Sequence, residues 1–396
     1  MVTPAPAGRP RFDIADIVRR HRAELEATTS LSTEQRRVLS AIVLCRTAAL
    51  GGHLEYCAVC GYEKPVYNSC RNRHCPKCQA LAQEAWIAAR AARILPVGHF
   101  HVVFTLPSEL RAMALRHPRL LYGALFSAAS ETIAELFATR HGVRPGMTMV
   151  LHTWTRELTH HPHIHALITA GGFKLGADGT GTWVPTSTKY LFPVAVMSEL
   201  FRGKMTDTIR RLRAEGRLHD IAGLDIKDDA AWARFMARLF RGRWVVHAKR
   251  PFRRVDHVLQ YLGRYTHRVG ISNSRLVSVT DRAVTFRTKN GKTVTLSPVE
   301  FLRRFVRHAL PNGFHKIRHF GLYASTAQDK LERAREDLTS SAPSAATPAA
   351  PAADVPEYVA ALLAATGRDV RVCPHCGGPL VRLPLARAPP LAAAAE

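Results

Sequence analysis

The stretch His163-Ile164-His165-Ala166-Leu167-Ile168-Thr169-Ala170 predicts a β-strand that ends at two glycines. A second predicted strand, residues 147–157, precedes it, and a polar connection rich in histidine joins the two. Side chains two positions apart in a strand point to the same side, so His163 and His165 can converge on one point. Two imidazoles at one point can hold a metal ion.

The chain on both sides of these strands alternates between predicted strands and predicted helices. The further strands are 99–106 and 244–249, and the helices are 194–216, 228–240, 252–267 and a pair within 108–140 interrupted near His117-Pro118. This order predicts an α+β fold in which helices back an antiparallel sheet of four or five strands.

Composition shifts divide the chain into five predicted segments. They are a helical and zinc-ribbon-like N-terminal segment at 1–95, a catalytic domain at 96–270, a basic β/α extension at 271–337, a flexible Ser/Ala/Pro linker at 338–355, and a short tail with a CxxC at 356–396.

Charge indicates the kind of partner. The 396 residues include 56 Lys and Arg against 31 Asp and Glu, a formal net charge of +25, which favours a polyanion such as DNA or RNA. No signal peptide or long apolar run is evident, so we expect a soluble cytoplasmic protein with no membrane partner, associated with the nucleoid when it binds DNA.

The eight cysteines follow metal-ligand spacings. Cys57-Ala-Val-Cys60 and Cys75-Pro-Lys-Cys78 predict one structural zinc site with four thiolates. The same region contains candidates for a second zinc site: Cys45, His53, Cys70 and His74. The alternative for His74 is a surface position that faces DNA.

The last two cysteines, Cys373 and Cys376, supply only half a zinc site. His375 or another chain would have to complete it, or the pair binds no ion at all.

A predicted helix carries two tyrosines four positions apart, Tyr261 and Tyr265, which therefore share a face. His257, Arg264 and Arg268 fall on the same side. Packing of the tyrosines at the edge of an apolar stripe is the alternative. A second His-x-His pair, His99 and His101, shows that two such histidines alone are weak evidence for a metal site.

Four stretches together resemble the rolling-circle transposases of the insertion-sequence-ninety-one family, within the two-tyrosine HUH endonuclease superfamily. They are the block from Tyr67 to Cys78, the strand His161-Pro-His163-Ile-His165, the helix from Gln260 to Arg268, and residues 312–323. The resemblance implies a zinc-binding domain followed by a ferredoxin- or RRM-like catalytic palm. It also implies the HUH role for His163 and His165, and not for His99 and His101.

The resemblance further implies a mechanism. Tyr261 or Tyr265 would attack single-stranded DNA at a transposon end, form a 5′-phosphotyrosine link and release a 3′-OH, with Arg264 and Arg268 stabilising the phenolate. Mg²⁺ or Mn²⁺ would stabilise charge on the phosphate. His257 is the preferred third metal ligand, and its rivals are Gln260, Glu157 and His152.

Basic residues in two regions are candidate phosphate contacts. They are Arg71, Arg73 and Lys77 in the cysteine block, and Lys316, Arg318 and His319 near Phe314 and Phe320, aromatic rings that could stack on bases. An ordinary solvated basic face is the alternative for each.

The main hypothesis is a transposase whose partners are the DNA of its element ends, the target DNA and the host replication machinery. Two other functions are alternatives to it. One is a rolling-circle replication initiator of a plasmid or phage, against which the zinc segment argues. The other is a non-catalytic, zinc-dependent DNA-binding regulator. The oligomeric state stays open.

Overall fold

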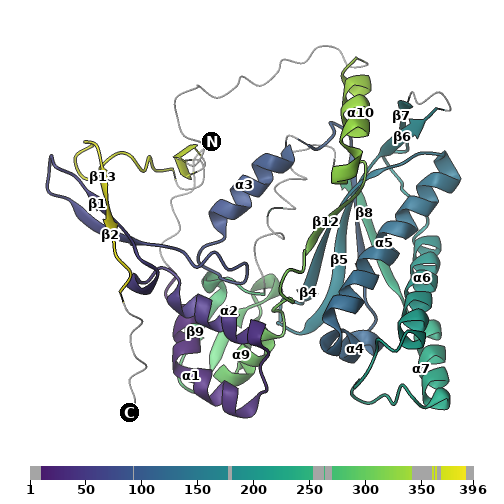
Figure 1. The fold of residues 1–396 in the computed structure, drawn as a ribbon, viewed down its shortest axis with the longest axis horizontal. Helices are drawn as coiled ribbons and strands as arrows, with labels where there is room; N and C mark the ends of the chain where they lie inside the picture. Colours follow the sequence, from purple (N-terminus) through teal and green to yellow (C-terminus); the bar gives the residue numbers. More distant parts are fainter. Residues whose placement is uncertain are drawn as a thin grey trace.

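A five-stranded antiparallel sheet, here called the palm sheet, forms the centre of the computed structural model (Figure 1). Its strands lie in the order β12 (Ile317–Gly321), β4 (Gly146–Trp154), β5 (His160–Thr169), β3 (His99–Thr105) and β8 (Val245–Phe252). The structure describes residues 10–91, 93–176, 181–252, 263, 270–340, 359–360, 362–363 and 367–388. The predicted α+β class with an antiparallel sheet is confirmed, and the strand β12 comes from the segment predicted as a separate extension.

One face of the palm sheet is apolar because alternate side chains point to it. Phe100 and Phe104 of β3 and Ile164 of β5 are fully buried there. Four helices cover this face: α4 (Arg111–Arg116), α5 (Pro118–His141), α6 (Val194–Ala214) and α7 (Asp229–Arg241). The Phe104 ring packs edge-on against Phe201 of α6, with 5.1 Å between centroids. Burial of one such side chain contributes about 1.5–3 kcal/mol.

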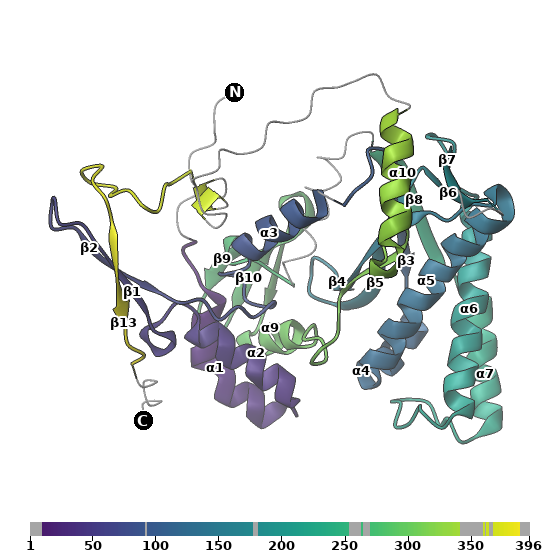
Figure 2. The ribbon, with the colours of Figure 1, turned by 45° about the horizontal axis from the view of Figure 1, so that its top comes forward.

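The opposite face of the palm sheet is polar. The remaining alternate positions place His101, Thr148, His152, His163 and His165 on it, as the pairing of β3, β4 and β5 shows. Helix α3 (Ala80–Ala91) lies over this face, and its Trp86 packs against Val150 and Leu167. Figure 2 shows α3 above the N-terminal helices and beside the palm sheet.

A second hydrophobic core joins two segments far apart in the sequence. The N-terminal helices α1 (Ile14–Thr28) and α2 (Thr33–Leu44) pack with α9 (Pro298–Val306) and the sheet of β9 (Leu276–Val279), β10 (Val284–Arg287) and β11 (Thr293–Leu296). The Ile14 amide donates to the Asn273 side chain at 3.2 Å. Residues of the ranges 14–45 and 271–309 therefore share one core, although the sequence predicted them in separate units.

The C-terminal segment also joins the N-terminal part. Strand β13 (Val381–Leu385) pairs with β1 (Gly52–Tyr56), which pairs with β2 (Glu63–Tyr67), giving a three-stranded sheet that stands to one side of the palm in Figure 1. The prediction of 356–396 as a separate tail is therefore wrong for β13, since its backbone hydrogen bonds go to β1.

The remaining elements surround the palm or connect the sheets. They are the hairpin of β6 (Gly171–Leu175) and β7 (Gly181–Pro185), the helix α10 (Gln328–Ser340), and the short 3-10 turns Ala48–Leu50, Ser108–Leu110, Asn273–Arg275, Lys289–Gly291 and Ser325–Ala327. Most of the predicted helix at 252–267 lies outside the described residues. Among the helices the structure describes, none is long and apolar enough to cross a membrane.

We expect Gly321→Ala to destabilise the palm much more than Gly313→Ala. Both glycines have positive φ, +62° and +68°, where a side chain costs roughly 1–2 kcal/mol. A Cβ at Gly321 would additionally lie 1.8 Å from the Pro145 carbonyl oxygen, whereas nothing lies within 4 Å of one at Gly313. Urea unfolding should give a loss of about 4 kcal/mol or more for Gly321→Ala. Equal losses for the two variants would contradict this account.

Candidate functional site

Three histidines meet on the polar face of the palm sheet. His152 of β4 stands directly opposite His163 of β5 in the strand register, and His165 lies two positions further along β5. Their candidate ligand nitrogens all lie within 4.8 Å of one another. The ring centroid of His152 lies 5.3 Å from that of His163 and 4.5 Å from that of His165. The three side chains, here called the histidine trio, can therefore face a single ion.

Hydrogen bonds orient two members of the trio. His163 Nδ1 donates to the His161 carbonyl at 2.7 Å, which leaves Nε2 with its lone pair. His165 Nδ1 lies 2.9 Å from Nε2 of His101, and the two rings stack. Burial lowers the pKa of His163 to about 4. Burial, followed by the charges of His163 and His101, lowers the pKa of His165 to about 2.

The trio fits a divalent cation by the chemistry of its donors. Neutral imidazoles with the second nitrogen already hydrogen-bonded are the form in which histidine binds metals. Here His163 and His165 are neutral near pH 7 and held by His161 and His101. His152 is held by stacking on Trp154, with centroids 4.7 Å apart.

The two His-x-His pairs have different surroundings. His101 contacts the trio through His165, but His99 does not join it: its Nδ1 bonds to the Val97 carbonyl and its Nε2 to the Tyr323 hydroxyl, each at 2.8 Å. His99 therefore ties β3 to the turn after β12. Of the second pair, only His101 supports the site.

Residues 260–268, here called the tyrosine segment, lie outside the described residues except for Gly263. This holds for Tyr261, Tyr265, Arg264, Arg268, His257 and Gln260. Gly263 is described and buried, and a Cβ there would come within 2.4 Å of Ile87 Cδ1 in α3. The middle of the tyrosine segment therefore contacts the helix that lies over the polar face. Glu157, a predicted rival ligand, is exposed and is not grouped with the trio.

The cysteines are grouped differently from the prediction. Cys45, Cys70, Cys75 and Cys78 form one cluster, here called the inner cluster, while Cys57 and Cys60 lie beside Cys373 and Cys376. The predicted set of Cys57, Cys60, Cys75 and Cys78 is therefore wrong. Cys57 and Cys60 sit between β1 and β2, at the tip of a hairpin about 16 Å long, whereas Cys45 and Cys70 flank its base.

The inner cluster fits a zinc ion. Cys45 caps the end of α2, Cys70 and Cys78 have sulfurs 3.7 Å apart, and all eight cysteines are free. The thiols share hydrogen bonds that lower the pKa of Cys45 and raise those of Cys70 and Cys75, so the four sulfurs already lie in mutual contact, as ligands of one ion would.

The predicted histidine ligands for the second zinc site, His53 and His74, belong to neither cysteine cluster. His74 is buried, with Nδ1 3.2 Å from the Asn72 side-chain oxygen and Nε2 3.2 Å from the His308 carbonyl. It therefore joins the cysteine block to the end of α9, and it does not face DNA.

Four predicted phosphate contacts are engaged within the protein. Arg73 donates to the carbonyls of Phe314 and Pro311, and Lys77 pairs with Asp13 at 2.7 Å. Lys316 is buried, and burial together with the charge of Arg73 lowers its pKa to about 7. Arg318 stacks over Phe126 and Phe314, 4.5 Å and 5.0 Å from their centroids. Arg71 is exposed and stays a candidate.

The predicted stacking residues Phe314 and Phe320 belong to the palm core. Phe314 is buried there, and Phe320 packs against the same core. Their rings contact Phe126 of α5 and are not free to stack on bases.

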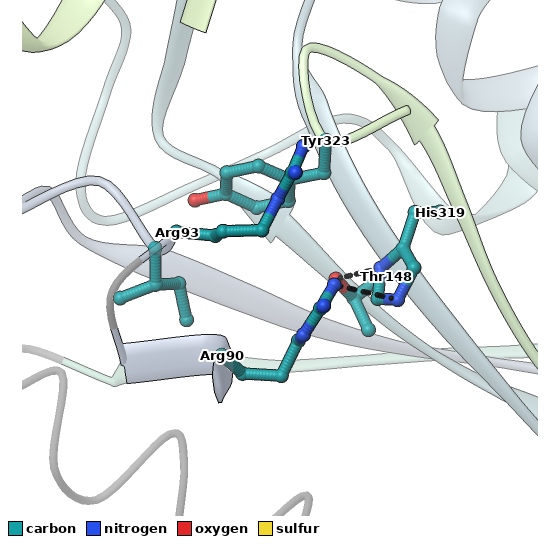
Figure 3. Close-up of a pocket in the computed structure, with 6 residues that line it drawn as sticks. Arg90, Arg93, Thr148, His319 and Tyr323 are labelled. Carbon is teal, nitrogen blue, oxygen red and sulfur yellow. Dashed lines mark hydrogen bonds between the residues drawn. The ribbon is translucent and has the colours of Figure 1, made fainter. Parts of the chain in front are cut away.

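A basic pocket that the sequence did not predict lies on the polar face (Figure 3). Arg90 and Arg93, at the end of α3, reach towards Thr148, His319 and Tyr323. Arg90 Nη1 donates to His319 Nε2 at 3.1 Å, so His319 Nδ1 donates to Thr148 Oγ1 at 3.0 Å. In the sequence, the feature that could have indicated this pocket is the pair Arg90 and Arg93 at the end of an Ala-rich predicted helix.

The charge of this pocket is not balanced by the residues around it. Burial and the neighbouring Arg93 lower the pKa of Arg90, and burial with both arginine charges lowers the pKa of His319 to about 4. Within the described part of the chain, no carboxylate is among the groups that affect the pKa of Arg90, and Nε of both arginines and Nη2 of Arg93 are buried without a hydrogen-bond partner. Such a pocket suits an anion.

The palm sheet with its histidine trio follows a cysteine cluster in the chain, and the comparisons with known families identify this combination. Residues 146–330 match the family described as "Putative transposase", and residues 17–106 match the family described as "Transposase zinc-binding domain". The protein is therefore a transposase with an N-terminal zinc-binding domain, an enzyme that acts on DNA.

Two relatives narrow the family. The chain is 44% identical to "Putative transposase y4qJ" of Sinorhizobium fredii, over 92% of each chain. It is 30% identical to "Transposase for insertion sequence element IS801" of Pseudomonas savastanoi pv. phaseolicola, over 72% of this chain and 69% of the relative. It belongs to the insertion-sequence-ninety-one family of transposases. No solved structure matches the chain.

Proposed function

We propose that this transposase nicks and rejoins single-stranded DNA at the ends of its element through a 5′-phosphotyrosine intermediate, and so drives rolling-circle transposition. The observation that carries the proposal is the trio of His152, His163 and His165, whose ligand nitrogens lie within 4.8 Å of one another on the polar face. The contact of Gly263 with Ile87 supports it, because Gly263 lies between Tyr261 and Tyr265 in the sequence.

The trio would hold Mg²⁺ or Mn²⁺. A bound divalent ion would supply positive charge for a scissile phosphate, whose oxygens complete its coordination. We propose His152 as the third protein ligand in place of His257, because the strand register brings it opposite His163. His101 would keep the His165 ring in the orientation for binding through their shared hydrogen bond.

In the proposed reaction a tyrosine is the nucleophile. The phenolate oxygen of Tyr261 or Tyr265 attacks phosphorus, a new P–O bond forms, and the bond from phosphorus to the 3′ oxygen breaks. The 3′ oxygen leaves with the electron pair and takes up a proton, while the phenol proton has passed to solvent. One phosphodiester replaces another, so the reverse step can rejoin the strand. The second tyrosine allows another transfer while the first is occupied.

Arg264 and the neighbouring cations would lower the energy of the phenolate. A tyrosine has an ordinary pKa near 10, and a positive charge within a few ångströms favours its ionised form. Arg264 and Arg268 follow Tyr261 within about two turns of the predicted helix. Both roles come from the resemblance and stay proposals.

Purified protein incubated with labelled single-stranded DNA from an element end and Mn²⁺ should form a covalent adduct that survives denaturing electrophoresis. The Tyr261→Phe/Tyr265→Phe variant should form none, and each single variant should retain some. His152→Ala and His163→Ala should lower the cleavage rate by roughly 10²-fold or more while DNA binding stays, since each removes one ligand of the charge-stabilising ion.

The same assay separates the competing functions. An adduct from the double phenylalanine variant, or no adduct from the wild type, would overturn the proposal and favour a non-catalytic DNA-binding regulator. A replication initiator would share the chemistry but would require its own replication origin and would not join element ends to target DNA.

His101→Ala should weaken Mn²⁺ binding about 10- to 100-fold, because loss of such a supporting hydrogen bond typically costs that much. His101→Gln keeps an acceptor for His165 Nδ1 and should recover part of the affinity. His99→Gln is the matched control: it lies on the same strand face and does not touch the trio. Calorimetric titration measures the affinities. An unchanged value for His101→Ala would exclude this positioning role.

The basic pocket would hold a phosphate of the same DNA strand. Thr148 precedes His152 by four positions on one face of β4, so the pocket and the trio are about 13 Å apart along the strand. The side chains of Arg90 and Arg93 are only half-buried, so their guanidinium groups can donate to phosphate oxygens at the mouth of the pocket. Thr148 and His152 therefore give two candidate phosphate-binding positions on one face of β4, on either side of the contact between Val150 and Trp86.

Arg90→Gln/Arg93→Gln should weaken binding of single-stranded DNA and flatten its salt dependence. Each phosphate contact contributes about 0.7 to the slope of log affinity against log salt, so two lost contacts reduce it by about 1.4. Arg234→Gln/Arg241→Gln removes the same charge from α7, on the far side of the palm core. Fluorescence anisotropy across salt concentrations compares them, and equal slopes in both variants would rule out the pocket as a phosphate site.

A further inference from the structure

The cysteines Cys57, Cys60, Cys373 and Cys376 come from the two ends of the chain and meet in one cluster. We propose that they bind a zinc ion in a ribbon that the N-terminal and C-terminal segments build together. The family matches cover residues 17–106 and 146–330, so Cys373 and Cys376 lie outside both. This site does not depend on the proposed strand transfer.

The distances between the sulfurs are those of a metal site. Cys57 and Cys376 have sulfurs 3.6 Å apart, and those of Cys60 and Cys373 are 3.7 Å apart. Four sulfurs about 2.3 Å from a tetrahedral zinc ion lie about 3.8 Å from one another. A disulfide would require about 2.05 Å. The four thiols therefore already have the spacing of a zinc site.

The two CxxC turns have the same backbone conformation. The Cys57 amide donates to the Tyr62 carbonyl at 3.0 Å, and Gly61 donates back to Cys57 at 2.9 Å. At the matching positions, Cys373 donates to Gly378 at 2.7 Å and Gly377 donates back to Cys373 at 3.0 Å. Two identical turns that present cysteines to each other are the halves of one site.

A glycine follows each turn for a conformational reason. Gly61 and Gly377 both come directly after the second cysteine and have φ of +70° and +77°, which other residues rarely adopt. Cys78 is instead followed by Gln79. The pattern C-x-x-C-G therefore pairs the first and last knuckles and separates them from the one at Cys75 and Cys78.

Backbone amides support thiolates at the C-terminal knuckle. His375 donates to the Cys373 sulfur at 3.4 Å and Gly378 to the Cys376 sulfur at 3.5 Å, and such bonds stabilise the charged form. The His375 ring packs on Tyr62, with centroids 4.7 Å apart. His375 is therefore a packing residue. All four proposed zinc ligands are cysteines.

Contacts around the cluster hold the C-terminal segment in place. Strand β13 pairs with β1 over five positions, from Tyr56 with Val381 to Gly52 with Leu385. Arg368 pairs with Glu55 at 3.2 Å, and the Ala388 amide donates to the Ala48 carbonyl at 3.1 Å. The ion would close a connection between residues 313 positions apart.

Zinc content of full-length protein tests the proposal in a His163→Ala/His165→Ala background, so that the trio takes up no zinc. We expect two ions per chain, one for each cysteine cluster. Cys373→Ser/Cys376→Ser should retain one, Cys57→Ser/Cys60→Ser should retain one, and the variant with all four changes should also retain one, because these cysteines share an ion. Mass spectrometry of the metal measures each value.

Two further variants act as controls. His375→Ala should keep both ions. Cys75→Ser/Cys78→Ser combined with Cys373→Ser/Cys376→Ser should keep none, since it removes half of each cluster. The proposal is wrong if Cys373→Ser/Cys376→Ser keeps two ions, or if changing Cys57 and Cys60 together with Cys75 and Cys78 removes only one.

Unsubstituted cysteines provide a second measurement where serine variants fail to fold. X-ray absorption of the zinc-loaded protein in the same histidine-trio background should show sulfur alone around zinc. Nitrogen in that shell would overturn the assignment, because it would require His375, His53 or His74 as a ligand.

Discussion

The pairing register of β4 and β5 is the constraint on which the site depends. His152 stands opposite His163, so the trio shares one face. Because the side-chain period of a strand is two, a slip of β5 by one residue would send His163 and His165 towards α5 and bring Ile164 to the polar face. The apolar face is buried under α5 and α6, and that burial makes such a slip costly. The geometry of the trio is therefore a consequence of packing on the other side of the sheet.

Burial also decides the charge state of the site. Removal from water lowers the pKa of His101, His163 and His165 well below 6.5, so the native state holds them neutral. An unfolded chain would protonate them below about pH 6.5. Protonation therefore favours the unfolded state increasingly as the pH falls from about 6.5 towards the folded pKa values, and above pH 6.5 the native state loses no stability to it. Neutral imidazoles are also the form that binds metal ions, so the property that makes the site sensitive to acid prepares it for a cation.

Local patterns predicted the parts of the fold that local physics determines. The strands at 99–106 and 163–170 follow from β-forming residues and flanking glycine or proline, and their helical backing follows from element order. The grouping of the cysteines depends on long-range pairing, so spacing alone misassigned Cys57 and Cys60. The position of His152 required the register of two strands, and the internal contacts of Arg73 and Lys316 required the long-range packing of the cysteine block against residues 311–316. The sequence did contain a signal for the correct grouping: a glycine follows Cys60 and Cys376, where the turn needs positive φ, but no glycine follows Cys78.

The zinc-binding part of the chain is connected to the palm through α3. The inner cluster ends at Cys78, directly before the helix, and Cys45 and Cys75 belong to the second hydrophobic core. At the other end, Arg90 bonds to His319 of the palm sheet. A helix held at both ends keeps Ile87 against Gly263, the one described residue of the tyrosine segment. By contrast, no described residue of β1, β2 or β13 belongs to a hydrophobic core. A ribbon without a core requires another source of stability, and four thiolates around one ion can provide it. The inner cluster therefore lies at the start of the helix that covers the polar face, whereas a zinc ion on Cys57, Cys60, Cys373 and Cys376 would hold together the two ends of the chain.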